Sequence, residues 1–65
     1  MKLSKDKLDL CLARTGMTKS ELAEKSGVRL SSILHALKSN SNIYPHTAGK
    51  LSEALGVDVT ELIAN

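Results

Sequence analysis

Apolar residues recur at helical spacing in short stretches of this chain, and a glycine follows three of these stretches where helices commonly end. In the first stretch, Leu8, Cys11 and Leu12 stand at positions i, i+3 and i+4. This spacing predicts a helix over about residues 4–15, opened by a serine that can act as its N-cap. Leu10 lies off the stripe, so we expect it to be exposed.

The second stretch begins with the pattern of a capping box. The hydroxyl of Thr18 can accept a helix N–H, while the carboxylate of Glu21 can accept the N–H of that threonine. Met17 precedes the cap in the position of a hydrophobic staple, and Leu22 is expected to face inward. With Gly27 as its end, this pattern predicts a helix of about eight residues.

Three further elements follow. A third helix is predicted over about residues 30–38, a polar loop occupies 39–42, Pro45 begins a fourth helix, and a last short helix opens at Asp58 or Thr60. Their expected apolar faces are Leu30, Ile33, Leu34, Ala36 and Leu37, then Ala48, Leu51, Ala54 and Leu55, then Val59, Leu62 and Ile63. The whole pattern predicts an all-α fold, a compact bundle of five short helices.

Composition places all of this in one domain, residues 1–65, because so short a chain has room for a single small core. That core must be aliphatic, since the chain has one tyrosine and no phenylalanine or tryptophan. The lone Cys11 cannot form an internal disulfide, which favours a cytoplasmic location. We expect no membrane association, since there is neither a long apolar run nor a signal-peptide pattern.

Charge is unevenly distributed along the chain. Residues 1–38 carry eight Lys or Arg and four Asp or Glu, a balance of +4, whereas residues 39–65 carry one Lys and three acids, a balance of −2. A basic half favours a polyanionic partner at one end of the molecule. Charge alone supports equally well a set of lysines that only solvate helix surfaces.

Catalytic and metal chemistry have little support. His35, His46 and Cys11 lack the paired spacing of a zinc site. The chain has neither a scaffold to activate a nucleophile nor a glycine-rich phosphate loop. We therefore expect a protein that is not an enzyme and that binds no metal, cofactor or small-molecule ligand.

Two segments carry a resemblance to a known family. Residues 17–28, MTKSELAEKSGV, followed by Ser31-Ser32-Ile33, resemble the helix-turn-helix of the Cro and lambda-repressor type regulators, the Xre family. Residues 51–63, LSEALGVDVTELI, resemble the end of the same domain, so that the likeness covers about residues 8–63. It implies a five-helix domain without a cofactor, whose helix-turn-helix at about residues 18–38 binds double-stranded DNA.

The resemblance also implies a set of contacts with DNA. Base contacts are implied for Arg29, Leu30, Ser31, Ser32, Leu34 and His35, and phosphate contacts for Thr18, Lys19, Lys38, Ser39, Asn40, Ser41 and Asn42. Arg29 can donate to guanine O6 and N7, which gives about 1–3 kcal/mol of discrimination, or it can form a surface ion pair instead. His35 can donate to a guanine or a phosphate, or it is simply solvated.

The other residues implied to contact bases also have alternative roles. Either of the two serines can donate to DNA or cap the third helix. Leu30 and Leu34 can contact only thymine methyls or the core, and we expect at least one of them in the core.

The chain departs from the family at three positions. Many members have an arginine where this chain has Leu12 and a glutamate where it has Leu37, and the two often form a partly buried ion pair. Replacing such a pair with apolar side chains is often neutral or stabilising, so we predict that the two leucines are in contact. Ser39 replaces the usual glycine after the third helix, and the following loop is slightly longer.

These observations predict a small sequence-specific transcriptional repressor of phage or mobile-element type that acts by occupying its operator. Because one small module neutralises few phosphates, we expect a homodimer on DNA. Its candidate contacts are the exposed parts of Val59, Leu62 and Ile63, or Leu10. The alternative is a protein-binding module of the same fold, an antirepressor or antitoxin-like domain that uses Leu30 and Leu34 to dock a protein.

Overall fold

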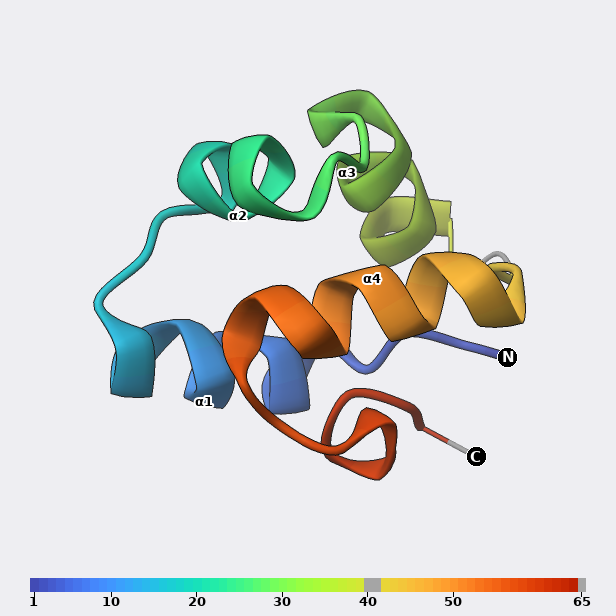
Figure 1. The fold of residues 1–65 in the computed structure, drawn as a ribbon. Helices are drawn as coiled ribbons and strands as arrows, with labels where there is room; N and C mark the ends of the chain where they lie inside the picture. The colour runs from blue at the N-terminus through green and yellow to red at the C-terminus, as the bar shows by residue number, and fades with distance from the viewer. Residues whose placement is uncertain (40–41, 65) are drawn as a thin grey trace.

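The computed structural model describes residues 1–39 and 42–64. These contain four α-helices, α1 (Lys5–Thr15), α2 (Lys19–Ser26), α3 (Leu30–Ser39) and α4 (Pro45–Leu55), followed by a 3₁₀ turn, η1 (Val59–Glu61) (Figure 1). The predicted all-α class is confirmed. The predicted fifth helix is a single 3₁₀ turn, because the chain leaves it at once to form an antiparallel bridge between Ile63 and Leu3.

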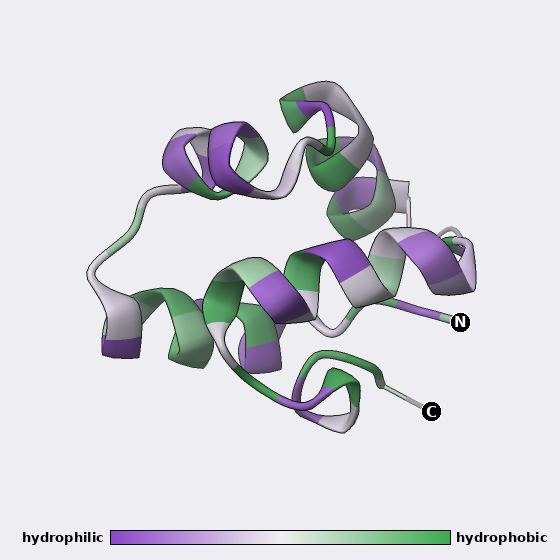
Figure 2. Ribbon diagram, in the orientation of Figure 1, coloured by the Kyte–Doolittle hydropathy of each residue, from purple (hydrophilic) through white to green (hydrophobic). Residues whose placement is uncertain are grey.

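The helices form two levels around one core. In Figure 1, α2 and α3 lie above α4 and α1, and η1 lies below α4. Helix α2 packs on both α3 and α4, while α4 also packs on α1 and η1. The core cluster consists of Leu3, Leu8, Cys11, Leu12, Leu22, Ile33, Ala36, Leu51, Ala54, Leu55 and Leu62. Helix α2 is mostly hydrophilic, whereas α1, α3 and α4 carry longer hydrophobic stretches (Figure 2).

The predicted helix boundaries of α1 and α2 are confirmed by their caps. The hydroxyl of Ser4 accepts the N–H of Lys7 at 3.3 Å. At α2, the Thr18 hydroxyl accepts the N–H of Glu21 at 3.1 Å, and the Glu21 carboxylate accepts the N–H of Thr18 at 2.9 Å. The exposure predicted for Leu10 is also confirmed, at 72%.

The apolar face of α3 differs from the expected one. Ile33 and Ala36 are buried and Leu37 packs partly on the core, but Leu34 is 45% exposed. Leu30 is only half-buried and does not belong to the core cluster. Thus the expectation that Leu30 or Leu34 lies in the core is wrong. Successive helix residues are turned by about 100°, and a short helix that packs mainly on α2 buries a narrower stripe than the sequence contains apolar residues.

Leu12 and Leu37, the two leucines that replace the family's ion pair, occupy apolar surroundings. Leu12 is a member of the core cluster, and Leu37 packs against that cluster. Their direct contact stays a prediction.

Both ends of the domain are joined by backbone hydrogen bonds. The N–H of Ser4 donates to the carbonyl of Leu62 at 2.8 Å, and the N–H of Ala64 donates to the carbonyl of Lys2 at 2.8 Å. On the other side of the first residues, the N–H of Ile43 donates to the carbonyl of Met1 at 2.7 Å. The N-terminal segment therefore lies between the segment that precedes α4 and the segment that follows η1.

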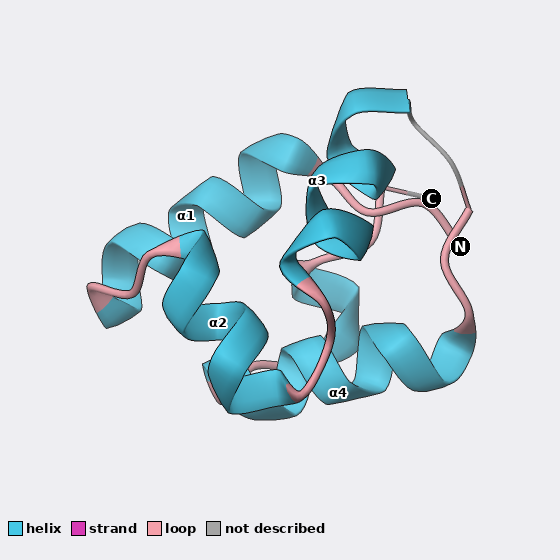
Figure 3. Cartoon of the chain, turned by 90° about the horizontal axis from the view of Figure 1, so that it is seen from above, coloured by secondary structure: helices cyan, strands magenta, loops and turns pink. Residues whose placement is uncertain are grey.

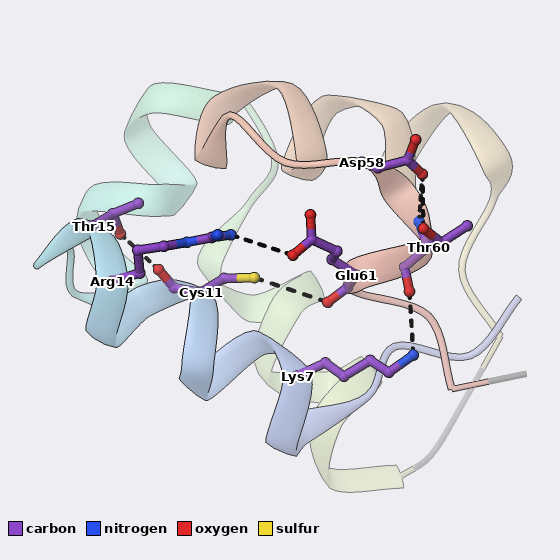
Figure 4. A network of polar contacts seen from close by, with 7 residues as sticks. All are labelled: Lys7, Cys11, Arg14, Thr15, Asp58, Thr60 and Glu61. Carbon is purple, nitrogen blue, oxygen red and sulfur yellow. Dashed lines mark hydrogen bonds and ion pairs between the residues drawn. The ribbon is translucent and has the colours of Figure 1, made fainter.

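Side chains of α1 reinforce this junction (Figure 4). The ammonium group of Lys7 donates to the carbonyls of Thr60 and Ile63 at 3.2 and 3.0 Å. Arg14 forms an ion pair with Glu61 at 3.4 Å. In consequence, two of the cations in the basic half are directed at the C-terminal turn.

An aspartate caps the C-terminal turn. The carboxylate of Asp58 accepts the backbone N–H and the hydroxyl of Thr60, both at 2.9 Å. These two hydrogen bonds, chiefly the one from the backbone, lower the pKa of Asp58 below its ordinary value.

The capping box gives a stability prediction. Thr18→Ala removes the acceptor for the Glu21 N–H, so we expect the free energy of unfolding to fall by about 1 kcal/mol. In a domain of this size that corresponds to a decrease of roughly 4–8 °C in Tm. The measurement is thermal or urea unfolding followed by circular dichroism.

Thr18→Ser is the matched control, because serine retains the capping hydroxyl and should unfold close to the unaltered protein. Equal stability losses in both variants would contradict a capping role for this side chain.

Candidate nucleic-acid interface

A glycine turn joins α2 to α3. Gly27 ends α2 with a φ of 78°, a left-handed conformation that glycine adopts without steric cost. Two residues later, the carbonyl of Arg29 accepts the N–H groups of Ser32 and Ile33 at 3.0 and 3.1 Å, which starts α3. Seen from above, α2 and α3 lie nearest the viewer, with α1 and α4 on either side of them (Figure 3). The two helices thus form one face of the domain.

Most of the predicted base-contacting residues are exposed on this unit. Arg29, Ser31, Ser32, Leu34 and His35 are all exposed, while Leu30 is half-buried. Ile33 and Ala36 occupy the side of α3 that faces the core, so residues at other positions around the helix are left exposed. Such a face offers a guanidinium, hydroxyl groups and an imidazole to one partner.

At the end of α3, His35 and Ser39 interact with each other. The Ser39 hydroxyl donates to the carbonyl of His35 at 2.7 Å, and the same oxygen lies 3.3 Å from His35 Nε2. The hydrogen bond to the carbonyl places the serine oxygen where the ring can donate to it. This contact orients the imidazole on the outer face of the helix.

The side chains predicted to contact phosphates lie at two places. Thr18 and Lys19 stand at the start of α2, and the capping bond of Thr18 uses its oxygen as an acceptor, which leaves the hydroxyl hydrogen for another partner. Lys38 and Ser39 stand at the end of α3 and are exposed. Asn42 is exposed, and its backbone bridges to the N-terminal segment. Asn40 and Ser41 lie outside the described residues.

The ion pairs do not involve Arg29. Within residues 1–39 and 42–64, they are Lys5 with Asp9 at 3.1 Å and Arg14 with Glu61 at 3.4 Å. The surface ion pair considered as the alternative for Arg29 is therefore not formed in this part of the chain. Its guanidinium extends from an exposed residue at the start of α3.

Sequence reasoning missed one cation beside this face. Lys5, in the first turn of α1, lines a surface hollow together with Lys19 and Lys38. Leu34 and Leu37 line the same hollow. In the sequence Lys5 is only one of several lysines outside the helix-turn-helix, so no signal marked it. Only the packing of α1 against the rest of the fold brings it to this place.

An aromatic contact at the start of α4 was also missed. The rings of Tyr44 and His46 are stacked, with centroids 5.6 Å apart. Both residues are exposed, so this contact does not belong to the core.

The described part of the chain supports neither a metal site nor a membrane-spanning helix. It contains no cluster of three or more His, Cys, Asp or Glu side chains that could hold a metal ion. None of its helices combines the length and hydrophobicity needed to cross a lipid bilayer.

Comparison with known proteins agrees with this geometry. A family model described as helix-turn-helix matches residues 11–62, which is most of the chain. No curated protein and no solved structure matches the chain. The matched range contains the capping box of α2, the glycine turn, α3, α4 and η1. The chain belongs to the Cro/C1-type, Xre-like helix-turn-helix family of DNA-binding regulators.

Proposed function

We propose that this protein is a sequence-specific repressor of the phage or mobile-element type, which binds double-stranded DNA as a homodimer and acts by occupying its operator. The observation that carries the proposal is the exposure of Arg29, just before α3, and of Ser31 and His35 on α3, a helix that packs on α2. A helix presented in this way fits the major groove of B-DNA.

In the proposed complex, the first turns of α3 contact base edges. Arg29 donates both guanidinium branches to guanine O6 and N7, the commonest specific contact in the major groove. Ser31, Ser32 and His35 donate to base edges, and Leu30 and Leu34 contact thymine methyls. The 45% exposure of Leu34 is compatible with this role, because the side chain is accessible to a thymine methyl.

Phosphate contacts fix the orientation of α3 in the groove. Lys19 and the Thr18 hydroxyl contact one strand from the start of α2, and Lys38, Ser39 and the segment at residues 40–42 contact the backbone beyond α3. The support is positional, since Thr18 and Lys19 lie at the start of α2 and Lys38 and Ser39 at the end of α3.

The dimensions of the molecule support a dimer. Its extents are 25 × 21 × 19 Å, whereas two successive major-groove segments on one side of DNA are about 34 Å apart. One copy therefore reaches one half-site.

The dimer contacts need one correction. Leu62 and Ile63 are 0% and 7% exposed, so they are buried within the domain and cannot serve as partner contacts. Leu10 is 72% exposed on α1 and Val59 is half-buried in η1. We assign the contact between copies to Leu10 and the adjoining surface of η1.

The proposal predicts the result of an in-vitro selection from random duplexes. The selected sequences should be palindromic, with half-sites about one helical turn apart, because a two-fold dimer presents two copies of α3. Sequencing of the selected pool measures this. No enrichment of duplex DNA would contradict the proposal and favour the protein-binding module of the same fold.

Salt dependence tests the role of Lys19. Lys19→Gln removes one phosphate contact from each copy of the dimer, so the slope of log K against log salt should fall by about 0.9 per copy, about 1.8 for the complex. The slope is obtained from binding titrations of the selected duplex at several salt concentrations. Lys50→Gln is the control with the same charge change, since Lys50 lies on α4 in a hollow with Lys25 and Glu53.

Base specificity tests the role of Arg29. Arg29→Ala should reduce the preference for the selected duplex over a variant in which one guanine of each half-site is replaced, by about 1–3 kcal/mol per base contact. Competition binding measures the preference. Arg14→Ala removes the arginine that pairs with Glu61 and should leave the preference intact. Unchanged discrimination in Arg29→Ala would remove this residue from the set of base-contacting residues.

A further inference from the structure

Three lysines from three different helices surround a hollow beside α3. Lys5 comes from the first turn of α1, Lys19 from the start of α2 and Lys38 from the end of α3. The other lining residues are Leu34 and Leu37, and no carboxylate is among the described residues that line it. The described residues that line the hollow are thus three lysines and two leucines.

This composition brings three cationic side chains to one hollow. Lysine side chains cover apolar surface with their methylene stems and keep the ammonium group in water, and the two leucines provide such a surface. Three lysines that line one hollow attract a polyanion more strongly than isolated surface lysines do.

The ion pair between Lys5 and Asp9 does not prevent such an interaction. The two groups are 3.1 Å apart on successive turns of α1, and their side chains are 66% and 44% exposed. Exposed pairs of this kind contribute little to stability, because both groups remain largely solvated. A phosphate can therefore replace Asp9 as the partner of Lys5 at low cost.

We propose that Lys5 is a phosphate-contacting residue of the DNA interface, and that it binds, together with Lys19 and Lys38, one strand of the duplex along this hollow. The inference rests on the proposed function, because Lys19 and Lys38 already belong to the proposed contact set. A strand that passes both of these lysines also passes Lys5, since all three line the same hollow. This continuity favours a DNA backbone over an acidic protein segment as the occupant.

The proposal extends the DNA contact to α1. Lys5 lies outside the two helices of the helix-turn-helix, and Leu12 on the same helix has no charge with which to attract a phosphate. Lys5 and Leu12 are seven residues apart, which places them near the same side of the helix.

The test measures affinity for the selected duplex across roughly 50–200 mM salt, the range over which phosphate contacts dominate the change. Because both copies of the dimer lose the contact, Lys5→Gln should reduce the log–log slope by about 1.8 and weaken binding about sixtyfold near 0.1 M salt. Lys5→Arg retains the cation and should keep the original slope. Lys50→Gln again controls for the loss of one charge. Circular dichroism confirms that the variants remain helical.

Asp9→Asn gives an independent check. Removal of the competing carboxylate should tighten binding about twofold, and this gain should shrink in the Lys5→Gln background because the ion pair no longer exists there. A gain of equal size in both backgrounds would show that Asp9 acts only through general charge and would contradict the proposed exchange of partners.

The outcomes separate the two proposals. If the unaltered protein binds duplex DNA and Lys5→Gln behaves like Lys50→Gln, the role of Lys5 is overturned while the proposed function stands. If the unaltered protein binds no duplex DNA, both are overturned. If the hollow binds an acidic protein segment and not DNA, Lys5→Gln would behave like Lys50→Gln, since the loss of Lys5 would not alter the slope for DNA.

Discussion

The burial of Leu22 holds the helix-turn-helix unit on the rest of the domain. Helix α2 is polar along most of its length, and Leu22, which is 0% exposed, is its only fully buried side chain. The same helix packs on both α3 and α4. Full burial of a leucine contributes about 1.5–3 kcal/mol, which is a large fraction of the stability of a domain this small. The position of α3, and hence of its outer face, depends on this contact.

The three cations of helix α1 fall into two groups. Lys7 and Arg14 are directed at the C-terminal turn, where they bind carbonyl groups and a carboxylate. Lys5 instead pairs with Asp9 and lines the hollow beside α3. The basic half of the sequence is therefore not one basic surface, because part of its charge stabilises the junction between the chain ends. What remains for a polyanion is a smaller set around α2 and α3.

Local features of the fold could be predicted from the sequence because they depend on residues close together in the chain. The capping box of Thr18 and Glu21 and the helix end at Gly27 need only neighbouring residues to form. The apolar stripe of α1 is confirmed for the same reason. The apolar stripe of α3 was predicted too wide, since Leu30 and Leu34 are apolar but neither belongs to the core cluster. Which residues of α3 are buried depends on how the helix packs, mainly on α2.

The candidate site shows the same division. The resemblance to the Cro and lambda-repressor family placed the base-contacting residues at the start of α3 and on α3, and most of them are exposed in the structure. It did not indicate Lys5, because that residue lies fourteen positions before Lys19 and outside the motif. Nor could the sequence show that Leu62 and Ile63 are buried, since their burial depends on pairing with the N-terminal segment.

By itself, the sequence determined the helical class, the caps, the glycine turn and the family, because each of these follows from short-range spacing. Only the tertiary structure decided which leucines remain outside the core, which cations are used internally and which three lysines meet beside α3. The physical reason is that these properties belong to contacts between distant segments. Their geometry is fixed by packing around a shared core, and no local pattern records it.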